Sequence, residues 1–141
     1  MIDRPLGRDL ERPELRRLVA GIAARPDLWG HHVRHSRDER VYEQLHRDEH
    51  VAIWLICWME DHDTGFHDHD LSAGAVFDFR ASDIHRVLHS GDRPAVTVHA
   101  YSPPLWRMGA YEIGRQGELR RHSISYAEEL RPLAEAVPAA L

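Results

Sequence analysis

An uninterrupted apolar run from Val51 to Trp58 places the strongest constraint on how this chain can fold. The run is far too short to cross a bilayer, but its length suits a single strand. Side chains alternate between the two faces of a strand, so both faces of this one are apolar and both must be covered. The run therefore predicts a strand in the interior of a barrel or sandwich.

The segments around this run also have strand character. Polarity alternates from Val41 to His46, before a turn at Asp48 and Glu49. It alternates again over residues 95–101, and that strand ends at Ser102-Pro103-Pro104 because proline cannot donate to a ladder. Gly114 and Gly117 bracket a polar turn, around which a further hairpin is expected. Its first strand is expected at Glu112 to Ile113.

Helices are expected only near the two ends of the chain. Apolar residues follow Pro13 at helical spacing, and Pro26 ends the pattern. Ser125-x-x-Glu128 has the form of a capping box that opens a short C-terminal helix. The expected organisation is one domain, with an N-terminal helix and connection (1–39), a barrel (40–124) and a C-terminal helix and tail (125–141). Residues 29–40 are expected to be a loop in which His31, His32 and His35 are solvated polar surface rather than a binding site.

Composition narrows the functional classes. Cys57 is the single cysteine in 141 residues, so no internal disulfide can form. With no apolar N-terminal segment, this predicts a soluble cytoplasmic protein with no membrane partner. The net charge is −5 and the eighteen basic residues, all arginine, are scattered, which argues against nucleic acid as a partner. Cys57 itself is expected to be a small buried hydrophobe.

Histidine is the outlier in composition, since six of the twelve lie between His62 and His99. His67 and His69 are one residue apart, so in an extended strand they leave the same face and can bind one metal ion. Clustered histidines could equally form a proton relay or polar surface. His85 and His89 cannot reach one metal equally from a strand, so one is expected to be a ligand and the other a polar neighbour.

Thr97, His99 and Tyr101 form a polar row on the strand at 95–101. The row is explained either by an edge strand with one face in water, or by a hydrogen-bonded chain from hydroxyl to imidazole to phenol that can pass a proton.

Four ordered motifs resemble the cysteine dioxygenase family, which are thiol dioxygenases with a cupin (jelly-roll) barrel. They are Cys57-Trp58, His67-x-His69, Asp83-Ile-His85-Arg-Val and Thr97-Val-His99-Ala-Tyr101-Ser-Pro-Pro104, within a match from about Tyr42 to Tyr111. The resemblance implies Fe(II) bound by His67, His69 and His85. It also implies a Thr97-His99-Tyr101 triad that directs the phenol into the active site.

This ligand set suits a thiolate substrate and O2. Three neutral imidazoles leave the positive charge of Fe(II) intact and leave open positions opposite them. A metal favours the deprotonated sulfur, which can then be oxidised to a sulfinate. The resemblance therefore implies oxidation of a small thiol, such as cysteine or 3-mercaptopropionate, with Tyr101 hydrogen-bonded to oxygen or substrate.

The chain departs from the family at two places. The family arginine that pairs with the substrate carboxylate falls near Val41 to Gln44, where Glu43 stands; Arg40 or Arg47 could take its place. Only fifteen residues, Asp70 to Ile84, separate His69 from His85. Relatives have several further strands there, so strands are expected to be missing at the Val76-Phe77 junction. An incomplete barrel would expose unpaired strand edges. The possible outcomes are a dimer in which one subunit lends a strand to the other, an altered sheet, or an inactive protein.

Two other functions fit the same residues. A catalytically silent cupin could bind a metal or small ligand through the same histidines. A zinc-dependent hydrolase would need a positioned carboxylate, for which Glu60 and Asp70 are the nearest in sequence.

Overall fold

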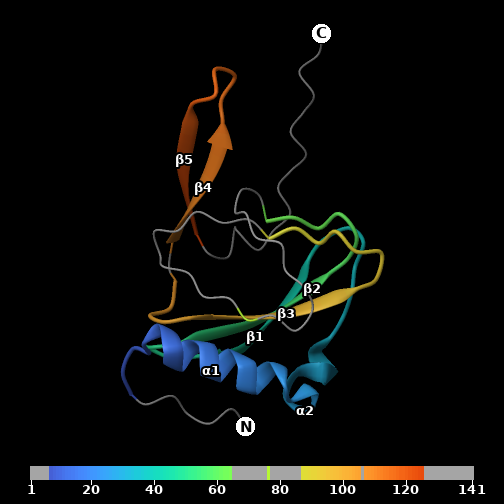
Figure 1. The fold of residues 1–141 in the computed structure, drawn as a ribbon, viewed down its shortest axis with the longest axis vertical. Coiled ribbons are helices and arrows are strands. Elements are labelled where there is room, and N and C mark those ends of the chain that lie inside the picture. Colours follow the sequence, from blue (N-terminus) through green and yellow to red (C-terminus); the bar gives the residue numbers. More distant parts are fainter. Residues whose placement is uncertain (1–6, 65–75, 77–86, 106, 126–141) are drawn as a thin grey trace.

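The computed structural model describes residues 7–64, 76, 87–105 and 107–125 (Figure 1). This part of the chain is mostly β structure with few helices, as expected for an all-β fold. The expected cupin barrel includes residues 65–75 and 77–86, which lie outside the described residues. In chain order the elements are α1 (Arg12–Ala23), α2 (Pro26–Trp29), the 3-10 helix η1 (Gly30–His32), β1 (Val41–Arg47), β2 (Ala52–Trp58), β3 (Ala95–Tyr101), β4 (Arg107–Ile113) and β5 (Leu119–Ser125).

The apolar run forms the central strand of an antiparallel sheet, in the order β1-β2-β3. Every residue of β2 except Trp54 is buried, so the prediction of an interior strand is confirmed. The pairing of β1 with β2 shifts by one residue between Gln44 and His46. This bulge changes which residues of β1 share a face after Gln44.

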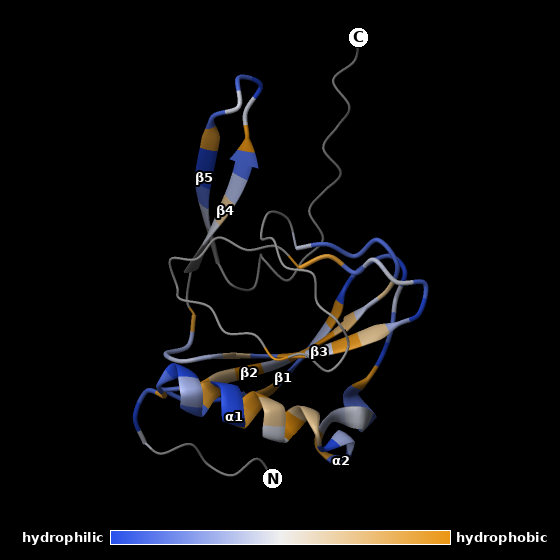
Figure 2. Cartoon of the chain, in the orientation of Figure 1, coloured by the Kyte–Doolittle hydropathy of each residue, from blue (hydrophilic) through white to orange (hydrophobic). Residues whose placement is uncertain are grey.

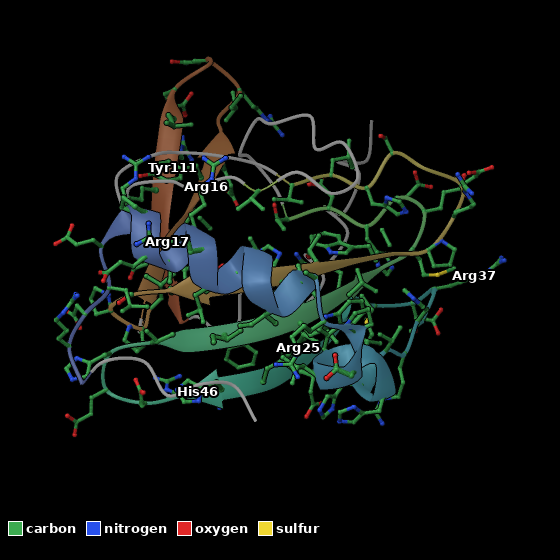
Figure 3. The ribbon with its side chains drawn as sticks, turned by 60° about the horizontal axis from the view of Figure 1, so that its bottom comes forward. Arg16, Arg17, Arg25, Arg37, His46 and Tyr111 are labelled. Carbon is green, nitrogen blue, oxygen red and sulfur yellow. The ribbon has the colours of Figure 1, made fainter. Side chains whose placement is uncertain are left out.

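One face of the sheet is covered by α1. Ile22 packs with Val51 and Ile53 in a buried cluster, joined by partly buried Val98 and Ala100 of β3. The apolar side of α1 faces the sheet in Figure 2, and the exposed Arg16 and Arg17, labelled in Figure 3, carry its polar side. The apolar side of α1 thus covers the face of the sheet formed by Val51 and Ile53, and α1 does not cover the opposite face.

Proline positions explain the helical region. Pro13 lies in the first turn of α1, and the amide of Glu11 donates to the carboxylate of Glu14 at 2.9 Å. The prediction of a helix that ends before Pro26 is confirmed. The prediction of a loop from residue 29 onward was wrong for its first residues, because Pro26 starts α2 and η1 follows it. Proline suits a first helical position, where its missing N–H is not needed.

The predicted hairpin after β3 is present as β4 and β5. The amide of Gly117, at φ +84°, donates to the carbonyl of Gly114 at 2.9 Å and closes the turn. β4 begins earlier than the two residues expected for it. The hairpin extends away from the three-stranded sheet in Figure 1 and is largely hydrophilic in Figure 2. The C-terminal helix expected after Ser125 lies outside the described residues.

Among the described helices, none combines the length and apolar character needed to cross a membrane.

Candidate functional site

The polar row of β3 lies on the face of the sheet opposite α1. In the β2–β3 register, Ile56 stands opposite Thr97, Trp54 opposite His99 and Ala52 opposite Tyr101. Directly opposed residues of an antiparallel pair share a face, and α1 covers the alternate residues. Thr97, His99 and Tyr101 therefore share the face that α1 leaves open.

Thr97 connects this row to β2 through hydrogen bonds. The indole Nε1–H of Trp58 donates to Thr97 Oγ1 at 2.7 Å, and Thr97 Oγ1 lies 2.7 Å from His99 Nε2. Trp58 is only 1% exposed, and its ring centroid is 6.5 Å from that of His99. The contact between hydroxyl and imidazole expected from the sequence is present. β3 is also an edge strand of the described sheet, so both explanations of the polar row hold in part.

The three histidines implied as iron ligands, His67, His69 and His85, lie outside the described residues. Within the described ranges, no group of three or more histidine, cysteine, aspartate or glutamate residues is arranged to hold a metal ion.

The two ends of the segment that contains these histidines lie side by side. The amide of Thr64 donates to the carbonyl of Val87 at 3.0 Å, and the amide of Val87 donates to Thr64 Oγ1 at 2.9 Å. Asp63 and Leu88 form an antiparallel bridge next to this pair. Paired backbone therefore brings together the described residues on either side of 65–86.

Val87 also packs in the apolar cluster of the sheet face opposite α1. This cluster consists of buried Ile56 and Trp58 with partly buried neighbours, among them Val87, Tyr101 and Leu105. The base of the histidine segment thus rests on the face that carries the polar row. Val87 thus packs against Ile56 and Trp58 of β2, the strand next to the one that holds the triad.

His89 has a local role in the turn after Leu88. Its Nε2 lies 2.7 Å from the carbonyl of Arg93, so Nε2 carries the proton and donates. His89 is half-buried and closes the turn over residues 89–93. His89, one of the two histidines left open by the sequence, is thus held as a polar member of this turn, and His85 lies outside the described residues.

Arg40 is a buried cation on the same sheet face, beside Trp58. It is 5% exposed, and its guanidinium carbon lies 5.7 Å from the centre of the Trp58 ring. Val41 pairs with Cys57, so the residue before Val41 falls beside Trp58 and on its face. A guanidinium has five N–H donors in a planar fork that fits a carboxylate. The guanidinium thus lies on the sheet face that carries the Trp58-Thr97-His99 contacts.

The other candidates near β1 are placed differently. Arg47 pairs with Ala52 but is exposed. Glu43 pairs with Leu55, on the face toward the helices, where its carboxylate lies 3.6 Å from Arg34. Of the two arginines considered from the sequence, Arg40 is buried on the sheet face of the polar row and Arg47 is exposed.

Cys57 and Glu60 were considered from the sequence as a buried packing residue and as a carboxylate for a zinc-dependent hydrolase. Cys57 is 2% exposed within β2, which confirms the prediction of a buried small residue. Glu60, the described one of the two carboxylates considered for a zinc hydrolase, is exposed just after β2.

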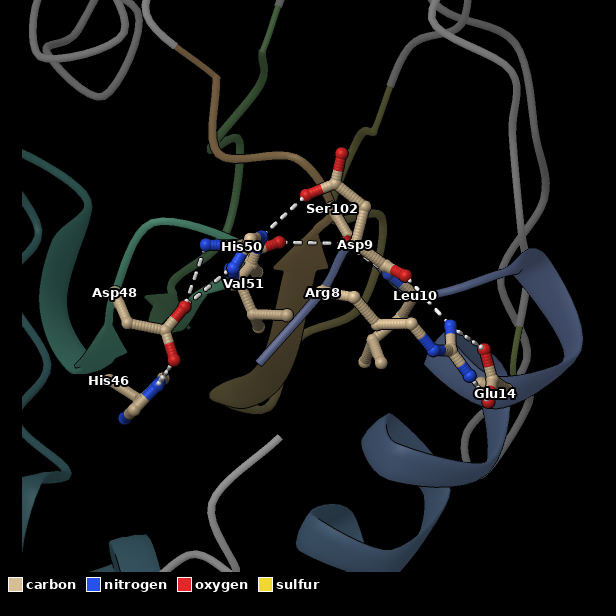
Figure 4. A network of polar contacts seen from close by, with 9 residues as sticks. All are labelled: Arg8, Asp9, Leu10, Glu14, His46, Asp48, His50, Val51 and Ser102. Carbon is tan, nitrogen blue, oxygen red and sulfur yellow. Dashed lines mark hydrogen bonds and ion pairs between the residues drawn. The ribbon is translucent and has the colours of Figure 1, made fainter. Parts of the chain in front are cut away.

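A polar network supports the end of the sheet near Tyr101 (Figure 4). Asp48 accepts from the amides of His50 and Val51, each at 2.8 Å, and lies 3.0 Å from His46 Nε2. These contacts, the amide of His50 and the His46 side chain first, lower the pKa of Asp48 from 3.8 to about 2. Ser102, directly after Tyr101, donates to the carbonyl of His50 at 2.7 Å. The β1–β2 turn and the end of β3 are thus fastened together.

Two features of this site were not identified from the sequence. Trp58 was noted only as part of a motif, although an indole beside a polar strand needs an acceptor when it is buried. The burial of Arg40 was also missed, because Arg37 and Arg40 belong to one polar stretch without a period. Only the register of β1 against β2 separates Arg40 from its neighbours.

Neither the models of known protein families nor the curated proteins contain a match to this chain.

Proposed function

We propose that this protein is a non-haem Fe(II) thiol dioxygenase that oxidises a small thiol to its sulfinic acid with O2. The observation that carries the proposal is the pairing of Thr64 with Val87 on the sheet face that holds Thr97 and His99. This pairing supports the proposal because it brings the described residues that flank His67, His69 and His85 to the face that carries the polar row.

Chain length supports a common site for the three histidines. His67 follows Thr64 by three residues and His85 precedes Val87 by two. Extended chain covers at most about 3.6 Å per residue, so these spacings reach at most about 11 Å and about 7 Å. Adjacent antiparallel strands are only about 5 Å apart. These limits leave His67, His69 and His85 able to meet above the sheet.

The donor set fits iron. His67, His69 and His85 would supply three neutral imidazoles, a ligand type that suits Fe(II). When bound, Fe(II) would bring a thiolate and O2 together so that the sulfur takes up both oxygen atoms as a sulfinate.

The chain's own residues would orient the substrate and move protons. Arg40 would hold a substrate carboxylate in a bidentate pair, which favours small thiols that carry one, such as cysteine or 3-mercaptopropionate. Tyr101, on the same sheet face as His99, would offer its phenol as a hydrogen-bond donor to the reacting groups. Ile56 and Trp58, both buried, would keep water away from this end of the site.

A catalytically silent metal-binding or ligand-binding cupin is the second candidate. It is favoured by the fifteen residues between His69 and His85, which are too few for the strands that relatives have there. Such a protein would keep the metal site but lack a closed barrel that excludes water.

Metal content and oxygen uptake distinguish these functions. The protein is purified anaerobically, its iron and zinc are measured, and oxygen uptake is followed with cysteine and with 3-mercaptopropionate. The proposal expects stoichiometric iron and thiol-dependent uptake with a sulfinate product. Bound iron without uptake would reject it in favour of the silent binder.

Two histidine variants test the ligand assignment. His85→Ala should lose iron and oxygen uptake together. His89→Ala is the matched control, since His89 donates to the Arg93 carbonyl, and it should retain both. Uptake that survives His85→Ala would overturn the ligand set.

A further inference from the structure

The hydroxyl of Thr97 has two contacts in the described structure, and both are short. It accepts from Trp58 Nε1–H at 2.7 Å and it lies 2.7 Å from His99 Nε2. An indole N–H can only donate, so Trp58 uses one lone pair of the hydroxyl oxygen. The hydroxyl is left with one proton and one lone pair to offer to His99.

These contacts determine which nitrogen of His99 carries the proton. If His99 Nε2 were protonated, it would donate to Thr97, and the Thr97 proton would have no acceptor at either of its contacts. If Nε2 is unprotonated, the Thr97 hydroxyl donates to it and every group is satisfied. Both contacts are part-buried, and polar groups shielded from water favour the arrangement in which each has a partner, so the second arrangement is favoured. A neutral imidazole with an unprotonated Nε2 carries its proton on Nδ1.

We propose that Trp58 is a positioning residue that fixes His99 as the Nδ1–H tautomer, acting through the hydroxyl of Thr97. Trp58 is held for this role, since it is 1% exposed in the middle of the apolar cluster and Arg40 lies over its ring. Free histidine and exposed histidines interconvert between tautomers. In this protein a rigid indole one strand away selects one of them.

The tautomer matters for catalysis, a consequence that rests on the proposed function. With Nδ1 protonated, His99 offers a donor and not an acceptor on its second nitrogen. A Tyr101 oxygen that accepts from His99 keeps its own proton free to donate into the site. The other tautomer would take that proton as an acceptor and leave the phenol oriented away from the substrate.

The tautomer is measured by long-range ¹H–¹⁵N correlation on the full chain with labelled histidine and no paramagnetic metal, at a pH where His99 is neutral. Wild type is expected to show an unprotonated Nε2 and a protonated Nδ1, with His99→Gln used to assign the signal. Trp58→Phe, which keeps an aromatic ring and removes the donor, should lower the ratio of Nδ1–H to Nε2–H forms by roughly threefold to tenfold. Trp29→Phe is the matched control, because the Trp29 indole donates to the Ile22 carbonyl at 3.0 Å and not to Thr97, and it should leave the ratio unchanged.

Thr97 variants keep the test decisive if Trp58→Phe does not fold. Thr97→Val should shift the tautomer ratio, and it should also speed hydrogen exchange of the Trp58 indole by roughly tenfold, while Thr97→Ser preserves both signals. A protonated Nε2 in wild type, or an unchanged ratio in folded Trp58→Phe, would overturn the inference. The readout needs neither iron nor thiol. A fixed Nδ1–H form without oxygen uptake would therefore reject the proposed function and leave this inference standing.

Discussion

Thr64 and Val87, twenty-three positions apart in the chain, are joined by two hydrogen bonds. The Thr64 amide donates to the Val87 carbonyl at 3.0 Å, and the Val87 amide donates to the Thr64 hydroxyl at 2.9 Å. The pair closes the base of the segment that carries His67, His69 and His85. Because Val87 also packs against the Trp58 cluster, the two ends of that segment are held on the face that bears the polar row.

Removal of the Thr64 hydroxyl is expected to loosen this base. Thr64→Val keeps the shape of the side chain but leaves the part-buried Val87 amide without its Oγ1 acceptor. The expected cost is about 1–3 kcal/mol in the free energy of unfolding, with weaker iron binding. Denaturant unfolding and iron content measure the two effects. Ser36→Ala, which removes a hydroxyl from the connection before β1, should leave the iron content unchanged; an equal loss of iron in both variants would contradict the assigned role.

Arg40 is expected to determine the affinity for thiols that carry a carboxylate. Arg40→Lys keeps the charge but loses the bidentate fork, so KM for cysteine should rise by roughly tenfold or more. The effect should be much smaller with a thiol that lacks a carboxylate, such as cysteamine. Arg47→Lys, the same change at the exposed arginine of β1, serves as control. Equal losses for both classes of thiol would show that Arg40 acts on the fold rather than on the carboxylate.

Asp48 should make the protein resistant to acid. Its pKa is lowered to about 2 in the folded state, so its contribution is fully present above its ordinary value of 3.8 and is lost as the pH falls through about 2. Asp48→Ala should therefore reduce stability by about 1–3 kcal/mol at neutral pH, and the difference from wild type should shrink between pH 4 and pH 2. Denaturant unfolding at several pH values measures this difference in stability. Glu49→Ala, a change at the exposed neighbouring carboxylate, is the control. A difference that stays constant over that range would contradict the paired carboxylate.

Cys57 is expected to serve packing alone. Cys57→Ala should cost about 1 kcal/mol and Cys57→Ser about 1–3 kcal/mol, because a hydroxyl at this 2% exposed position loses its water. Both variants should keep thiol-dependent oxygen uptake. A thiol reagent should modify Cys57 in the native protein only as fast as the protein unfolds locally. In denaturant the modification should go to completion. Rapid modification of the native chain, or loss of uptake in a folded variant, would argue for a reactive cysteine.

Most of the secondary structure was predictable because its signals are local. The helix that ends before Pro26, the interior strand after Val51 and the hairpin around Gly117 follow from periodicity, proline and glycine within each segment. Pro26 was correctly taken as the end of α1, but the start of α2 there was missed. The same missing N–H that stops one helix suits the first position of the next.

The sequence by itself determined the strands, their alternation and the polar row of Thr97, His99 and Tyr101, since these depend on neighbours along the chain. Only the tertiary structure decided which face of the sheet α1 covers, and that Arg40 is buried over Trp58 while Arg47 is exposed. It also decided that Trp58 donates to Thr97, thirty-nine positions away. These features depend on strand register, where a shift of one residue moves every side chain to the opposite face, and register is set by contacts between distant segments.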